Sequence, residues 1–231
     1  MLTGSDNLFA LAAVAPLLRE ELSQVPAWAA RRPAGRALLL HASAANHALD
    51  ADVRHLRLQR LHVEGSELGG DLRCAGDALP YEDEAFQLVF CQHAGDVAVR
   101  AGGMIDELAR VLAPGGVLLW CGLSPWSPWL LWMNWQARRG GMAPRPQHAD
   151  SVRERLRRHG VAATGVQHLG SCWPPFEPAR WQRLAPTPLR AAYLLVAAKQ
   201  RAILTPLRPR ALRERVAIQP HLAAPSRRAS A

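Results

Sequence analysis

Two polar side chains that could do chemistry stand close to apolar runs of the sequence. His93 comes just after the apolar run 86–91, and a histidine can remove a proton from a nucleophilic substrate near neutral pH. A histidine in a loop can equally serve only to cap or hydrogen-bond that loop. Asp77 stands in the turn Gly76–Pro80, where a carboxylate accepts hydrogen bonds from a ligand or from the turn's own backbone.

No other catalytic pattern is recognised. The nine histidines are scattered and form no His, Cys and Asp cluster with metal-site spacing, so we predict no metal. No Ser-His-Asp or phosphate-loop motif is present, since Gly115-Gly116 lacks a GxGxxG context. The four cysteines contain no CxxC pair, which excludes zinc ribbons and thioredoxin-type motifs and argues against a disulfide framework.

The stretch Ser124–Arg139 is unusual because four tryptophans recur in it at every third residue. In a helix, three residues advance by about 300°, so the four side chains fan over about 180° and one face cannot bury them all. Three interpretations remain open. The tryptophans form a lid over a substrate site, they pack on the sheet, or they contact a membrane surface beside Arg138 and Arg139, an interpretation we do not favour.

The net charge of +9 is unevenly distributed. Residues 200–231 carry seven arginines and one glutamate, a net charge of +6, which leaves +3 for residues 1–199. A basic surface that binds nucleic acid would be expected in the folded part. We therefore predict a basic tail and no specific binding of nucleic acid.

Apolar runs that suit strands alternate with helical patterns along the chain, which predicts a parallel sheet with helical crossovers. Helices are expected over 8–22, 44–53, 104–112 and 150–159, and strands over 37–40, 55–63, 72–74, 86–91, 117–121, 161–169 and 193–198. The predicted fold class is α/β, with a Rossmann-like seven-stranded, mostly parallel sheet, helices on both faces and a terminal antiparallel hairpin.

The chain divides into three expected parts. These are an N-terminal helical segment over 1–35, one α/β domain over 36–199, and a basic, poorly ordered tail over 200–231. The apolar run 8–18 lacks the preceding positive charge of a signal peptide, and prolines interrupt the apolar stretch 117–135. We therefore expect a cytoplasmic protein.

Two linked motifs carry a resemblance to a known family. The first is Gly76–Val89, in which Asp77-Ala78-Leu79-Pro80-Tyr81 precedes the strand Phe86-Gln87-Leu88-Val89. The second is Glu107–Leu118, which contains Arg110-Val111-Leu112-Ala113-Pro114-Gly115-Gly116. At this spacing the sequence resembles class I S-adenosylmethionine-dependent methyltransferases of the type 11 kind, which act on small molecules. The resemblance covers roughly residues 34–200, so that 36–199 would be a methyltransferase-like domain.

The resemblance implies S-adenosylmethionine as cofactor, bound beyond the carboxyl ends of the strands. Asp77 would bond the adenine amino group and Glu64 the ribose. The full set of residues implied for cofactor binding is His41, Ala42, Ser43, Glu64, Asp77, Ala78, Leu79 and Gln92. His93 is the implied catalytic residue, and Trp126 and Trp129 would contact the substrate.

The chain departs from the family pattern in three places. His41, Ser43 and Ala45 stand where glycines let the backbone approach the cofactor. The nearest carboxylates to the end of the second strand, Glu64 and Glu67, fit the ribose-binding position poorly, and Gln87 replaces an aspartate. Two functions therefore stay open. One is methyl transfer to a small, apolar acceptor, and the other is a catalytically degenerate methyltransferase-like domain that binds a partner or ligand.

Overall fold

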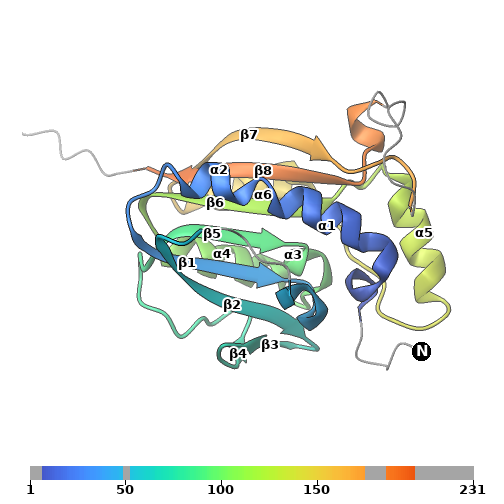
Figure 1. The fold of residues 1–231 in the computed structure, drawn as a ribbon, viewed down its shortest axis with the longest axis horizontal. Coiled ribbons are helices and arrows are strands. Elements are labelled where there is room, and N and C mark those ends of the chain that lie inside the picture. Colours follow the sequence, from blue (N-terminus) through green and yellow to red (C-terminus); the bar gives the residue numbers. More distant parts are fainter. Residues whose placement is uncertain (1–6, 49–52, 175–185, 201–231) are drawn as a thin grey trace, which may run out of the picture.

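The centre of the protein is one eight-stranded sheet (Figure 1). The computed structural model describes residues 7–48, 53–174 and 186–200. The strand order is β4-β3-β2-β1-β5-β6-β8-β7. The strands are β1 (Gly35–His41), β2 (Leu56–Glu64), β3 (Glu67–Gly70), β4 (Cys74–Ala75), β5 (Phe86–Gln92), β6 (Leu112–Leu123), β7 (Val161–Leu169) and β8 (Ala192–Lys199).

The middle of the sheet is parallel, as the sequence predicted. Strand β1 pairs in parallel with β2 and with β5, and β5 pairs in parallel with β6. Strand β8 is antiparallel to both β6 and β7, which confirms the terminal hairpin. These pairings bring the carboxyl ends of β1, β2, β5 and β6 to one edge of the sheet, where doubly wound folds bind ligands.

The sheet has eight strands rather than the predicted seven because β3 was not foreseen. Gly69-Gly70, a glycine pair typical of a turn, lies in β3, which pairs antiparallel to β2 with Glu64 opposite Glu67. Gly65 makes the two-residue connection possible, since its φ of 64° lies in the left-handed region that glycine tolerates. Strand β4 then pairs antiparallel to β3, so that it runs in the same direction as β2.

Helices cover both faces of the sheet. Helices α1 (Ala15–Leu22) and α2 (Val25–Ala29) lie on one face, and α3 (Ala94–Val97), α4 (Ala101–Val111) and α6 (Ala149–Arg158) lie on the other (Figure 1). Helix α5 (Pro128–Ala137) lies at the end of the molecule toward which β1 and β5 point. Short 3₁₀ helices complete the described chain at η1 (Leu8–Ala10), η2 (Ala12–Val14), η3 (Ala44–Ala48) and η5 (Thr187–Leu189).

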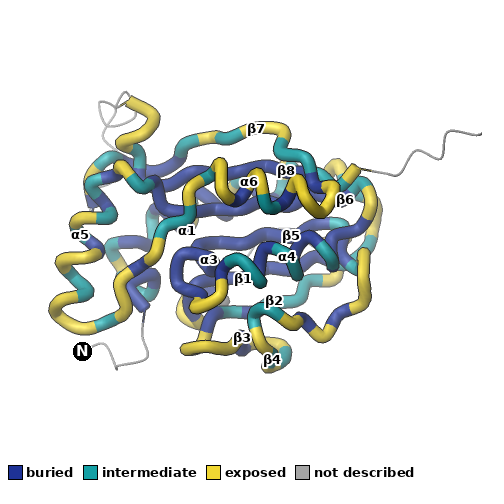
Figure 2. The backbone as a smooth tube through the Cα atoms, turned by 180° about the vertical axis from the view of Figure 1, so that it is seen from behind, coloured by how far each residue is buried: buried dark blue, intermediate teal, exposed yellow. Residues whose placement is uncertain are grey.

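The core lies on both sides of the central strands, because neighbouring residues of each strand point to opposite faces. Leu38 and Leu40 of β1 pack with α4 and α6, whereas Ala37 and Leu39 pack with α1 and α2. Figure 2 shows these strands as buried, while much of α5 and the loop after it is exposed. Continuous apolar runs such as Leu38-Leu39-Leu40 therefore indicated buried strands correctly.

The helix expected over 44–53 is the short 3₁₀ helix η3 in its described part. The motif residues Pro114–Gly116 form an irregularity inside β6, where the pairing with β5 shifts between Phe86 and Leu88. Within the described ranges, no helix is long and apolar enough to cross a membrane. The tail beyond residue 200 lies outside the described residues.

Candidate functional site

A cavity of about 310 Å³ opens at the carboxyl ends of β2 and β4, near the lower limit for a ligand site. Asp77, predicted to bind adenine, lines it together with Arg100 and Ser66. Its apolar wall comes from Val63, Leu68, Ala98, Val99 and Met104. A flat apolar ring with polar edge groups would match these walls. Glu64 is at the end of β2 and pairs with Arg73 at 3.1 Å.

Asp77 presents an ionised carboxylate to the cavity. Its Oδ2 accepts a hydrogen bond from Arg100 Nη1 at 2.8 Å, and this bond lowers the pKa of the Asp77 carboxyl below its ordinary value. Arg100 is 77% exposed at its side chain, against 28% for Asp77. The arginine can therefore swing into solvent when a ligand donor approaches the carboxylate.

The loop after Asp77 is fixed to α4 by two charged residues that the sequence analysis did not single out for this role. Glu107 Oε2 accepts from the backbone N–H of Leu79 at 2.8 Å. Arg110 donates to the carbonyl oxygens of Leu79 and Tyr81 at 3.0 and 2.9 Å, and to Asp83 at 2.6 Å. The arginine of the motif over 107–118 thus positions the cavity loop, and its spacing in that motif was the available signal.

Replacing Arg110 by alanine is expected to lower the free energy of unfolding by about 1.5–3 kcal/mol. The two carbonyls and the carboxylates of Asp83 and Glu107, which Arg110 also contacts at 2.7 Å, would lose a charged donor. Urea denaturation measures this loss. The control is Arg153→Ala, since Arg153 pairs with Asp150 at 2.6 Å on the exposed side of α6 and should cost about 0.5 kcal/mol or less. Equal losses for the two variants would contradict the positioning role.

The edge between β1 and β5 is closed by the N-terminal segment 7–22. His41, Ala42, Ser43, Gln92 and His93 are all buried there. The side-chain amide of Asn7 donates to the carbonyl oxygen of Ala42. Gln92 donates from Nε2 to the carbonyl oxygen of Leu18 at 2.8 Å and to Glu21 at 3.0 Å, and its Oε1 lies 3.0 Å from His41 Nδ1.

His93 is held on both sides by buried carboxylates. Its Nε2 lies 2.8 Å from Glu21 Oε1, and its Nδ1 lies 2.8 Å from Asp96 Oδ2. Burial opposes a charge on the ring, but the two carboxylates outweigh it and raise the pKa of His93 to about 10. Phe9 stacks on the ring with centroids 4.5 Å apart. The histidine is therefore charged at neutral pH and has no exposed atom, so proton transfer to an acceptor would require the segment 7–22 to move.

The predicted cofactor residues therefore fall into two groups. In the first group, Asp77 lines the cavity. Glu64 stands between the lining residues Val63 and Gly65, and Ala78 and Leu79 follow Asp77 in its loop. The second group consists of His41, Ala42, Ser43 and Gln92, which are buried beneath the N-terminal segment 7–22. Glu21 and Asp96 were missed. A signal for Glu21 was present, because it stands on the same helical face as the buried Leu17 and Leu18.

The two tryptophans predicted to contact substrate lie apart from the cavity. Trp126 is 73% exposed, and Trp129 is buried with its Nε1 donating to the carbonyl oxygen of Ser171 at 3.0 Å. Trp129 also packs edge to face on Trp132, with centroids 6.0 Å apart. In the part of the chain that the structure describes, no three His, Cys, Asp or Glu side chains are grouped to hold a metal ion.

Comparison with known proteins shows which proteins the domain is similar to. Residues 34–120 match the methyltransferase domain family, while no curated protein sequence matches the chain. The fold is similar to a chain of the complex between the Haloferax volcanii Trm112 methyltransferase activator and a proposed methyltransferase, with a TM-score of 0.51, 14% identity, and coverage of 84% of this chain and 95% of that chain. The fold is also similar to an S-adenosylmethionine-dependent methyltransferase from Mesorhizobium loti. The TM-score is 0.51 and the sequence identity 17%, with coverage of 81% of this chain and 98% of that chain. At these identities the likeness shows a shared fold.

Proposed function

Residues 34–120 belong to the methyltransferase domain family, and from this premise we propose that the protein is an S-adenosylmethionine-dependent methyltransferase whose Asp77 cavity receives the adenosine half of the cofactor. The observation that carries the proposal is the cavity itself. It combines apolar walls with an ionised carboxylate at the carboxyl ends of β2 and β4. An adenine ring would pack on the apolar wall, and its amino group would donate to Asp77.

The fit of the whole cofactor differs between its two halves. The residues around the cavity fit adenosine. The residues expected to hold the methionyl half, His41–Ser43 and Gln92, are buried and contacted by Asn7, Leu18 and Glu21, so in this arrangement they do not fit it. Methyl transfer therefore depends on release of the segment 7–22, which would also uncover His93.

The acceptor that we propose is small and apolar. Support comes from the aromatic residues that follow β6, where Trp129 and Trp132 pack edge to face between the end of that strand and Ser171. The apolar composition of this segment favours the burial of an apolar ligand near the carboxyl end of β6.

A second candidate function is favoured by the closed edge of the sheet. If the segment 7–22 stays in place, the chain is a methyltransferase-like domain that binds an adenine nucleoside without chemistry. The charged His93 between Glu21 and Asp96 supports this candidate, because separating buried paired charges is costly.

Titration calorimetry with adenosine and with S-adenosylmethionine tests both candidates. Adenosine is expected to bind, and Asp77→Ala should weaken it by about tenfold or more through loss of a hydrogen bond to a charged group. The matched control is Asp150→Ala, which removes a carboxylate paired with an arginine on α6 and should leave the affinity unchanged. Absence of binding by both compounds would refute the cavity as a nucleoside site.

The ratio of the two affinities separates the transferase from the non-catalytic domain. If the segment opens, the apparent affinity for S-adenosylmethionine is reduced by the fraction of open molecules. Phe9→Ala removes the ring stacked on His93 and should then strengthen S-adenosylmethionine binding without changing adenosine binding. Equal affinities for the two compounds in both proteins would favour the non-catalytic domain.

A further inference from the structure

The described surface has its large exposed hydrophobic side chains at one end of the molecule. Seven such side chains are exposed among the described residues, and six of them belong to α5 or to segments next to it. The six are Trp126, Leu131, Trp135, Met142, Trp173 and Leu189, which we call the tryptophan face. Isolated exposed hydrophobics are ordinary, whereas a gathered set marks an interaction surface.

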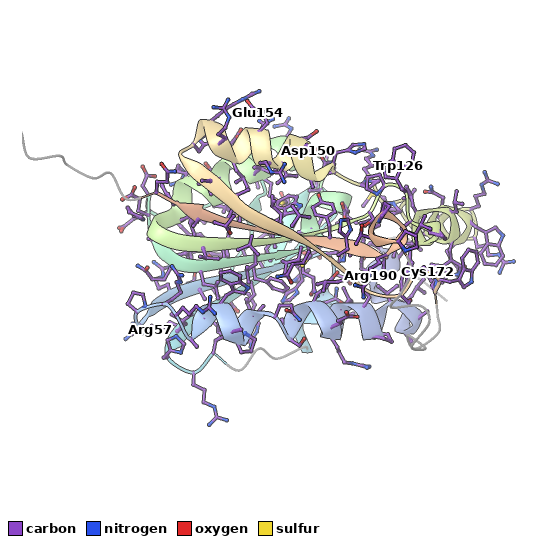
Figure 3. The ribbon with its side chains drawn as sticks, turned by 90° about the horizontal axis from the view of Figure 1, so that it is seen from above. Arg57, Trp126, Asp150, Glu154, Cys172 and Arg190 are labelled. Atoms are coloured by element: carbon purple, nitrogen blue, oxygen red, sulfur yellow. The ribbon has the colours of Figure 1, made fainter. Side chains whose placement is uncertain are left out.

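Contacts between the segments hold this set together. Ser127 Oγ donates to the carbonyl oxygen of Leu189 at 3.3 Å, and Ser171 Oγ donates to that of Trp173 at 3.0 Å. Trp129 joins α5 to Ser171. Figure 3 places Trp126, Cys172 and Arg190 at the α5 end of the molecule and Arg57 at the opposite end. The tryptophan face is therefore built from three separate parts of the chain.

Helix α5 is more apolar than its position in the fold explains. All six residues Pro128–Met133 are apolar, a composition that normally belongs to a helix buried on all sides. Trp129 and Met133 are buried, but Leu131 is 71% exposed and Trp135, one turn later, is 46% exposed. Among the described residues, this side of the helix is left exposed.

The charged residues of the described segments that form the tryptophan face are all arginines. From Ser124 to His148 the sequence contains Arg138, Arg139 and Arg145 and no acidic residue. The segment 186–191 contains Arg190 and likewise no acidic residue. Arg139 lies over the Trp135 ring at 3.6 Å from its centroid. The carboxylate that contacts this region, Asp96, accepts from Gln147 N and is fully buried.

We propose that the tryptophan face binds the surface of an anionic lipid bilayer, with α5 lying in the interface. Tryptophan and leucine enter the boundary between head groups and acyl chains, while arginines contact anionic head groups. Charge complementarity favours this partner, since the described segments 124–148 and 186–191 carry four arginines and no carboxylate. The proposal is independent of the nucleoside cavity, because no residue of the tryptophan face lines it.

Flotation of the full chain with phospholipid vesicles tests the proposal. The protein is expected to bind vesicles made of equal parts phosphatidylcholine and phosphatidylglycerol, and to bind pure phosphatidylcholine less. The double variant Leu131→Gln/Trp135→Gln should lose about tenfold or more in vesicle affinity. The double variant Arg138→Gln/Arg139→Gln should lose a similar factor in vesicle affinity. Salt screens the contacts between arginines and lipid head groups, so the loss caused by the arginine substitutions should become smaller at high salt, unlike the loss caused by Leu131→Gln/Trp135→Gln.

Two controls match these changes at sites away from α5. Val99→Gln removes the seventh exposed hydrophobic side chain, which is 58% exposed. Arg57→Gln removes an exposed arginine at the opposite end. Neither should change vesicle binding. All the substituted side chains are exposed, so thermal denaturation should show folded variants throughout.

Three results would overturn the proposal. The first is a wild-type chain that does not float with anionic vesicles at low salt. The second is flotation that survives Leu131→Gln/Trp135→Gln, which would assign the binding to charge elsewhere in the chain. The third is a dimer in light scattering that this double variant dissociates, without vesicle binding, which would make a second copy of the chain the partner of the face.

Discussion

Replacing Asp96 by alanine is expected to lower the free energy of unfolding by about 3–5 kcal/mol, because its removal leaves three hydrogen-bond donors without an acceptor, while His93 keeps only Glu21 as a partner. Asp96 Oδ2 accepts from His93 Nδ1 at 2.8 Å and from the backbone N–H of Leu123 at 2.9 Å. Its Oδ1 accepts from the N–H of Gln147 at 3.3 Å. The substitution would strand these three donors in a site without exposed surface.

Urea denaturation near neutral pH measures the effect, and Asp106→Ala provides the matched control. Asp106 also pairs with a histidine, His159, at 2.9 Å and with Arg155 at 2.6 Å, but its side chain is 34% exposed. Water can replace these partners, so the control should cost about 1 kcal/mol or less. If Asp96→Ala and Asp106→Ala lower the free energy of unfolding by comparable amounts, burial does not strengthen the contacts of Asp96 with His93 and its other donors.

The stability of the protein is expected to fall as the pH rises from about 6.5 to about 9. The pKa of His93 is raised from 6.5 to about 10 in the folded state, so above pH 6.5 the unfolded chain releases a proton that the folded chain keeps. The stabilisation is complete below pH 6.5 and is lost as the pH rises toward 10. One proton corresponds to a slope of up to about 1.4 kcal/mol per pH unit.

Denaturation at several pH values gives this slope, and His93→Gln should flatten it. The measurement ends near pH 9 because burial also raises the pKa values of the Cys91 and Cys121 thiols above 9.0, and these groups add losses of the same sign at higher pH. An NMR titration of the wild-type chain is an independent check. A His93 ring that titrates through neutral pH would contradict the raised pKa.

The sequence predicted the parallel core because that core leaves local patterns. Leu38-Leu39-Leu40 and the run 86–91 are apolar at every buried position, and β1 and β5 occupy those residues. Strand β3 was missed because Gly69-Gly70 resembles a turn, and only its pairing with Leu61 and His62 makes it a strand. Pairing across a sheet depends on partners that no local pattern reveals.

Of the candidate site, only the cavity around Asp77 was predictable from the sequence, and the closed edge between β1 and β5 was not. Asp77 lies in a short motif with regular spacing, and the structure gives it a cavity. The closed edge depends on Glu21 reaching His93 across the fold. A glutamate within an apolar helix and a histidine after a strand are each ordinary residues. Their pairing follows from the docking of α1, which is a tertiary event.

The closure of the sheet edge by α1 also has a consequence for synthesis. Glu21 and His93 are 72 positions apart, and Leu18 and Gln92 are 74 apart. At about 5–20 residues per second, the ribosome needs about 4–14 s to add the intervening chain, whereas a helix forms within about a microsecond. During synthesis, helix α1 therefore remains undocked, and Glu21 lacks its partner His93, until β5 has left the ribosome. Any small molecule that reaches the nascent edge of β1 and β5 competes with α1 for that surface before the chain is finished.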